Sequence, residues 1–206
     1  RVLFRSARAT LAVPTYLADK GLKTFADIAK FEKELGGKLY GIEPGSGANT
    51  QIKAMIAKNQ FGLGKFQLVE SSEAGMLAAV DRAVRRKEAV VFFGWAPHPM
   101  NVNVAMTYLT GSEDALGPNE GMATVWSVTS PTYAEQCPNV HKLLTNLTFT
   151  AADESRMMQP LLDHKDAFES AKQWLKDHPQ DQQRWLEGVT TFDGKPAAAN
   201  LQLTGK

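Results

Sequence analysis

The sequence lacks most of the features that assign a chain to a functional class at once. Cys137 is the single cysteine, so the chain by itself can form no disulfide bond. No apolar run approaches the roughly 18 residues that a membrane-spanning helix needs. The formal net charge is only +1, which gives no indication of a nucleic acid or another polyanion as a partner. What remains is the composition of an ordinary globular protein.

The motifs of common enzymes and metal sites are also missing. The sequence contains no Gly-x-Ser-x-Gly turn for a nucleophilic serine, no His-Glu-x-x-His and no pair of cysteines. Its histidines are scattered without the spacing of metal ligands: His98, His141, His164 and His178. We therefore predict no catalytic residue, no metal site and no cofactor.

An alternation of helical and strand patterns fills residues 22–94. The expected strands lie at 38–43, 66–71 and 90–93, with a helix before the first strand and a helix in each interval. This order predicts an α/β fold with a parallel sheet, wound in the right-handed sense, and helices on its faces.

The last third of the chain has a different pattern. From Asn139 onward it is typical of successive helices that have no sheet of their own. Trp126 stands where the two patterns meet, and we expect it at a hinge or in core packing. Trp174 and Trp185 fall at core-facing helical positions, so we expect both to pack inside this helical part.

Two loops follow the ends of expected strands and are the best candidates for a site. One is "EPGSGANT", residues 43–50, and the other is "GWAPHPMN", residues 94–101. In open parallel sheets, ligands bind at the carboxyl ends of the strands. Simpler interpretations remain open, since the first loop is also a normal glycine-rich turn and Trp95 can merely cap the core.

Several motifs in the same order resemble the choline and glycine betaine substrate-binding proteins of bacterial ABC importers, most closely the choline-binding branch. They are "TLAVPTYLADKGLKTFADIA", "GIEPGSGANTQI", "GWAPHPMN", "CPNVHKLLTNLTFT" and "WLEGVTTFDGK". The resemblance runs through nearly all of residues 8–196. It does not include the opening "RVLFRS", which we interpret as flanking sequence foreign to the family.

The resemblance implies the type II fold of periplasmic binding proteins, in which two lobes close on a ligand. In this chain the first lobe is expected to be incomplete, with about the first third of the mature protein lying outside it. The implied division is residues 1–15 for the end of the first lobe and the hinge, 16–124 for the second lobe, and 125–206 for a helix-rich return to the first lobe.

A quaternary ammonium ion spreads its charge over methyl groups and donates no ordinary hydrogen bond, so aromatic faces must recognise it. By matching motifs, the resemblance implies that Tyr16 and Trp95 belong to an aromatic cage. Asn49 is expected to reach the polar end of the ligand, with Ser46 as a second candidate. His98 is expected to orient its loop or to contact the ligand. The remaining cage residues are expected outside this chain.

Choline is the favoured ligand, because betaine-binding members of the family often carry a second tryptophan where Pro99 stands here. The resemblance also implies a monomer in the periplasm, an ABC permease as partner, and a cysteine outside this chain as the partner of Cys137. Three alternatives stay open. They are a glycine betaine-binding protein, a binding domain fused to its permease, and an enzyme on the same fold that would use Glu43 and His98.

Overall fold

The computed structural model describes residues 2–200 and divides the chain into two compact units. One unit is Ser6–Ala123, and the described part of the other comprises residues 2–5 and 124–200. The lobe division expected from the resemblance stays a prediction. Residues 6–14, expected at the end of the first lobe and the hinge, belong to a strand that lies with residues 15–123 in one compact unit.

The sheet is mixed, with strands in the order β3-β2-β4-β1-β5 and with β6 also paired to β1. β2 runs parallel to both β3 and β4, as the sequence predicts. β1 is antiparallel to its neighbours β4 and β5, so strands from outside residues 22–94 make the sheet mixed. The strands are β1 (Val2–Pro14), β2 (Lys38–Tyr40), β3 (Gln67–Val69), β4 (Phe92–Ala96), β5 (Met106–Tyr108) and β6 (Met122–Trp126).

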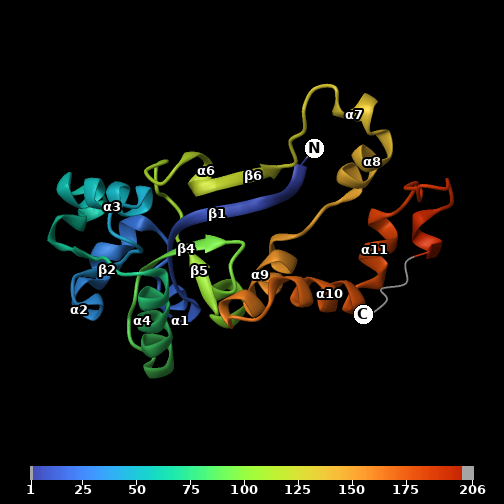
Figure 1. The fold of residues 1–206 in the computed structure, drawn as a ribbon. Coiled ribbons are helices and arrows are strands. Elements are labelled where there is room, and N and C mark those ends of the chain that lie inside the picture. The colour runs from blue at the N-terminus through green and yellow to red at the C-terminus, as the bar shows by residue number, and fades with distance from the viewer. Residues whose placement is uncertain (1, 201–206) are drawn as a thin grey trace. The chain divides into compact units, whose positions relative to one another are not determined.

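Helical segments cover both faces of this sheet (Figure 1). One apolar cluster joins Leu11 and Phe93 of the sheet to Ile52 and Met55 of α3. The other cluster joins Phe92 to Met76 and Val80 of α4, together with Met100 of α5. The segments are α1 (Thr15–Asp19), η1 (Phe25–Phe31), α2 (Glu32–Leu35), α3 (Gly47–Ala57), η2 (Gln60–Lys65), α4 (Glu73–Arg86), α5 (Met100–Asn103) and α6 (Pro118–Gly121).

Capping residues start these helices where the sequence indicates. Thr24 and Asp27 form a capping box at the start of η1, although the helix expected there is a 3₁₀ segment followed by the short α2. Ser72 caps α4 by accepting a hydrogen bond from the Gly75 N–H. Ser46 caps α3 in the same way, accepting from the Asn49 N–H at 3.2 Å.

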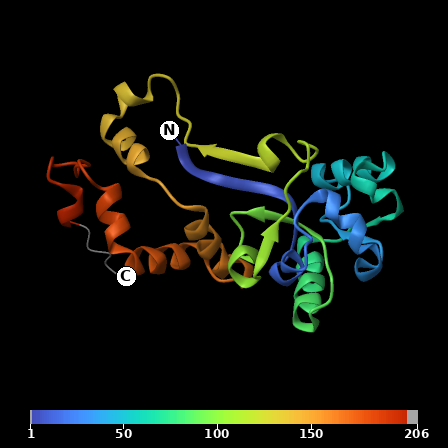
Figure 2. The ribbon, with the colours of Figure 1, turned by 180° about the vertical axis from the view of Figure 1, so that it is seen from behind.

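The second unit is helical, as predicted (Figure 2, orange and red). Trp174 and Trp185 stack with their ring centroids 5.6 Å apart, and Phe149 lies 4.9 Å from Trp185. Their predicted packing role is thus confirmed, whereas Trp126 is 58% exposed and not part of a core. The helices are α7 (Tyr133–Gln136), α8 (Pro138–Asn146), α9 (Ala151–Leu162), α10 (Ala167–Asp177), α11 (Pro179–Trp185) and η3 (Ala197–Asn200).

Two further observations concern the described residues. Cys137 is half-buried and carries a free thiol, so its predicted pairing with a cysteine outside this chain stays a prediction. Across residues 2–200, no helix has both the length and the apolar character needed to cross a membrane.

Candidate functional site

The carboxyl ends of β2, β3 and β4 meet at one edge of the sheet, because these strands are parallel. We call this the carboxyl edge. After β2 the chain enters α3 on one face, and after β3 it enters α4 on the other face. The winding therefore reverses between β2 and β4. Such a switch point is where open α/β sheets bind their ligands.

The loop that follows β2 is organised by the side chain of Asn49. Its oxygen accepts a hydrogen bond from the Ile42 N–H at 3.0 Å, and its nitrogen donates to the carbonyl oxygens of Ile42 and Glu43. The same nitrogen donates to Glu70 Oε1 at 3.0 Å, which ties this loop to the end of β3. Asn49 is 1% exposed, so its amide orders the loop in this structure.

Glycine makes this arrangement possible at position 41. A Cβ at Gly41 would overlap the side-chain oxygen of Asn49 and press against Leu68. Only glycine lets the amide lie against the backbone at the end of β2. Gly47, further along the same loop, has no such neighbour, since a Cβ there would meet nothing within 4 Å.

We expected the strand to end at Phe93 and Trp95 to follow it. In the structure Trp95 lies inside β4. β4 continues to Ala96, and Trp95 pairs with Ala9 of β1. The half-buried indole contacts Phe93 on its own strand, with ring centroids 5.9 Å apart. On the loop side it contacts the ring of His98, with centroids 4.7 Å apart.

His98 is 1% exposed and bonded at both ring nitrogens. Its Nδ1 accepts a hydrogen bond from the Met100 N–H at 3.0 Å, and its Nε2 lies 3.0 Å from Glu73 Oε1. Because Nδ1 accepts a backbone hydrogen bond, the ring hydrogen must be on Nε2, which donates it to Glu73. His98 therefore connects the loop after β4 to the start of α4.

Asn101 closes the loop after β4. Its side-chain nitrogen donates to the carbonyl oxygens of Trp95 and His98, at 2.8 and 2.9 Å. Its side-chain oxygen accepts from the hydroxyl of Tyr108 at 2.7 Å. Burial raises the pKa of Tyr108 to about 12, so this hydroxyl is a donor at neutral pH.

Carboxylates dominate the electrostatics of the carboxyl edge. The Glu73 N–H donates to Glu43 Oε1 at 2.9 Å and holds the pKa of the Glu43 carboxyl below its usual value. Lys53 Nζ lies 2.8 Å from Glu70 Oε2. The hydrogen bond of this ion pair lowers the pKa of the Glu70 carboxyl below its usual value. Among the described residues, His, Cys, Asp and Glu side chains do not gather in threes as metal ligands would.

Tyr16 does not belong to this site in the structure. β1 runs antiparallel to β4, so the end of β1, which precedes Tyr16, lies at the opposite edge of the sheet from Trp95. The Tyr16 hydroxyl donates to the carbonyl oxygen of Glu88, which precedes β4, at 2.6 Å. The structure therefore does not bring Tyr16 and Trp95 together, and the role of Tyr16 in an aromatic cage stays a prediction.

The remaining predicted residues do come together. Ser46, Asn49, Trp95 and His98 all belong to loops or strand ends at the carboxyl edge, and their role in binding stays a prediction. Sequence reasoning missed Glu70, Glu73 and Asn101, which connect them. The only signal was position, because Glu70 and Glu73 follow the end of a strand directly. A separate groove between α9 and α10, which Met157 and Trp174 help to line, includes none of the predicted residues.

Comparison with known proteins identifies the family of the chain. The family described as the substrate binding domain of ABC-type glycine betaine transport system matches residues 2–177. The glycine betaine/carnitine transport binding protein GbuC of Listeria monocytogenes serotype 1/2a (strain 10403S) is 29% identical over 167 residues. That match covers 79% of this chain and 55% of GbuC, so the chain spans little more than half the length of this relative.

Two solved structures show greater similarity. An ABC-transporter choline binding protein in complex with choline is 46% identical, with a TM-score of 0.71, over 97% of this chain and 69% of that chain. Such a protein in an unliganded semi-closed conformation is 47% identical, with a TM-score of 0.68, over 97% of this chain and 70% of that chain. These matches confirm the predicted α/β fold of type II periplasmic binding proteins.

The family consists of binding proteins of transporters and not of enzymes, so the enzyme alternative with Glu43 and His98 is set aside. The resemblance seen in the sequence motifs is confirmed as well, but the family match begins at residue 2 and overturns the interpretation of the opening residues as foreign to the family. The chain belongs to the family of substrate-binding domains of ABC-type glycine betaine transport systems.

Proposed function

We propose that this chain is the ligand-binding part of a periplasmic protein that captures choline and delivers it to the permease of an ABC importer. Trp95 supplies one aromatic wall of the site at the carboxyl edge. Residues of the other lobe complete the cage when the lobes close on the ligand. The 46% identity with a protein solved in complex with choline supports this ligand.

The negative charge of the carboxyl edge favours choline over glycine betaine as the ligand. Glu43, Glu70 and Glu73 approach this edge, and Lys53 is paired with only one of them, Glu70. Choline has a net positive charge and a neutral hydroxyl, so these carboxylates attract it. Glycine betaine carries a carboxylate, which the same groups repel.

The polar end of the ligand is assigned to the start of α3. The first N–H groups of a helix lack partners inside the helix, and those of Gly47 and Ala48 open α3 beside Ser46. Ser46 is the side chain we propose for the choline hydroxyl. Asn49 shapes the loop and does not contact the ligand, because its side-chain amide is hydrogen-bonded to Ile42, Glu43 and Glu70.

Isothermal titration of the full-length natural protein with choline, acetylcholine, carnitine and glycine betaine tests the proposal. We expect choline to bind most tightly and Trp95→Ala to weaken it about 30-fold or more, which corresponds to the roughly 2 kcal/mol of a desolvated cation–π contact. Phe168→Ala is the matched control, because Phe168 is 68% exposed on α10. Tighter binding of glycine betaine, or an unchanged affinity in Trp95→Ala, would contradict the proposal.

A further inference from the structure

We infer that Glu73 is a positioning residue, which fixes the ring of His98 and through it the indole of Trp95. The inference rests on the proposed function, in which Trp95 contacts the ligand. Glu73 itself lies outside the two loops that the sequence indicates, and it acts from the first turn of α4. Its role follows from three contacts at the carboxyl edge.

The first contact selects the form of the imidazole. A neutral histidine carries one ring hydrogen, on either nitrogen, and its hydrogen bonds decide which. In His98 the carboxylate of Glu73 faces Nε2 at 3.0 Å, while the Met100 N–H faces Nδ1. A carboxylate only accepts, so it holds the hydrogen on Nε2 and leaves Nδ1 able to accept from the backbone.

The second contact holds Glu73 itself in place. Its N–H donates to Glu43 Oε1, while the adjacent Ser72 caps the same helix end. The start of a helix carries partial positive charge, which stabilises a carboxylate in the first turn. The Glu73 side chain is 38% exposed, so it sits at the border between the buried His98 and solvent.

The third contact is between the rings of His98 and Trp95, and through it the orientation of His98 affects that of Trp95. The His98 and Trp95 rings are 4.7 Å apart at an angle of 55°, so a rotation of the imidazole displaces the neighbouring indole. Asn101 holds the carbonyl oxygens of Trp95 and His98, and so it fixes the backbone on both sides of this ring pair. The Met100 N–H and the Glu73 carboxylate hold the two ring nitrogens and so orient the ring.

The test compares Glu73→Ala with Glu73→Gln in the full-length protein. Glutamine keeps an oxygen that can accept from Nε2 but removes the charge. Nitrogen NMR of ¹⁵N-histidine-labelled, ligand-free protein reports the tautomer of His98, which His98→Gln assigns among the four histidines. Choline titration of the same variants reports the effect on binding.

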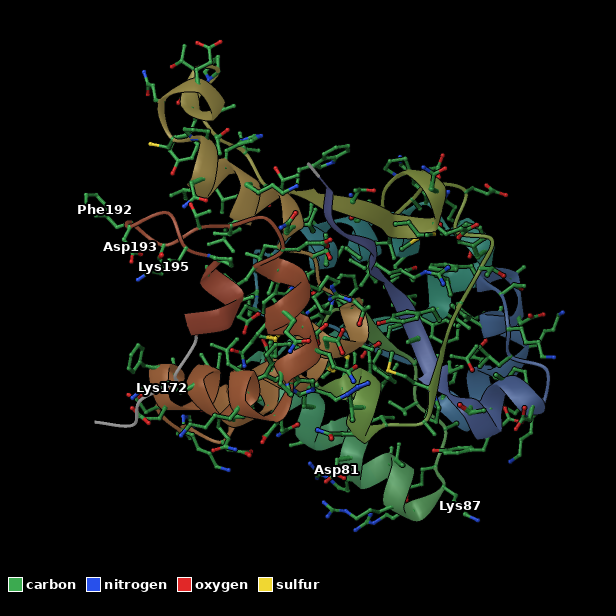
Figure 3. All side chains as sticks on the ribbon, turned by 90° about the vertical axis from the view of Figure 1, so that its right-hand side faces the viewer. Asp81, Lys87, Lys172, Phe192, Asp193 and Lys195 are labelled. Carbon is green, nitrogen blue, oxygen red and sulfur yellow. The ribbon has the colours of Figure 1, made fainter. Side chains whose placement is uncertain are left out.

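We expect Glu73→Ala to lose the fixed Nε2–H pattern and to weaken choline roughly tenfold, about the effect of one charge-assisted hydrogen bond. Glu73→Gln should keep the pattern and stay within about threefold of the wild-type affinity. Glu73→Met preserves side-chain length without an acceptor, and it replaces the alanine variant if that one fails to fold. Asp81→Ala is the matched control, since Asp81 lies further along α4, pairs with Arg85 and is labelled in Figure 3.

Three results would overturn the inference. The first is an unchanged His98 pattern in Glu73→Ala or Glu73→Met. The second is an equal loss of affinity in the glutamine and alanine variants, which would mean that Glu73 acts by its charge alone. The third is an equal effect of Asp81→Ala. If the wild-type protein binds no quaternary ammonium ion, the proposed function fails, and the NMR of the ligand-free variants still decides whether Glu73 positions the ring.

Discussion

The two units of the chain differ in how they bury apolar side chains. In Ser6–Ala123, both faces of the sheet are covered, and side chains such as Leu39, Phe92 and Leu109 are fully inaccessible to solvent. Among the described residues of the other unit, the buried apolar side chains are Trp185 and Val189, and each is still 6% exposed. The same unit exposes large apolar side chains, including Val128 and Phe168.

The difference reflects the geometry of the two architectures. A sheet presents two faces, and each helix that covers a face buries its own apolar stripe at the same time. A series of helices without a sheet must cover its stripes by helix–helix contact alone. We therefore expect stability and a preorganised site to reside in Ser6–Ala123.

The largest predicted effect tests the contrast between the two units directly. Phe92→Ala should lower the free energy of unfolding by about 3–5 kcal/mol, because the ring is fully buried between β4 and α4. Phe168→Ala should change it by less than about 0.5 kcal/mol, since this ring is exposed. Urea denaturation followed by circular dichroism measures both. Equal losses in the two variants would remove the contrast.

An intermediate effect is expected in the loop after β2. Gly41→Ala should lower the free energy of unfolding by roughly 1–3 kcal/mol, because the new methyl group displaces the Asn49 amide from its buried partners. Gly47→Ala is the matched control within the same loop, where a methyl group meets nothing. Thermal unfolding of the two variants makes the comparison. If the variants are equally stable, the loop is less tightly built than we describe.

The smallest effect concerns alkaline pH. The pKa of Tyr108 is raised to about 12 by burial, from an ordinary value of 10.0. The neutral phenol is thus favoured in the folded state, and its contribution to stability is complete below about pH 10 and lost as pH rises toward 12. Ultraviolet titration of phenol ionisation should show a late step that Tyr108→Phe removes. Ionisation of Tyr108 with the ordinary pKa of 10.0 would contradict the burial described for this side chain.

Local sequence patterns predicted the elements of residues 22–94 because each has its own periodicity and its own capping residues. They could not place β1, since its apolar residues fit a buried strand of either direction, and only pairing with β4 and β5 decides. The same pairing separates Tyr16 from Trp95. A motif match carries residue identities, whereas the edge of the sheet on which a residue lies depends on strand direction.

The end of β4 shows a second limit. Gly94 looked like the end of a strand, yet the strand continues through it to Ala96. A Cβ at Gly94 would press on Met106, Ala12 and Tyr108, so glycine is required here by neighbours distant in sequence. Glu73 and Asn101 escaped notice for the same reason, because their partners become visible only in three dimensions.

The hydrogen bonds of Asn101 have a consequence for the entropy of binding. One side chain holds the carbonyl oxygens on both sides of the Pro97 segment and is itself held by Tyr108. The loop that follows Trp95 therefore loses its conformational freedom when the chain folds, and a ligand that arrives later does not have to order it. More of the contact energy between ligand and protein then remains as affinity.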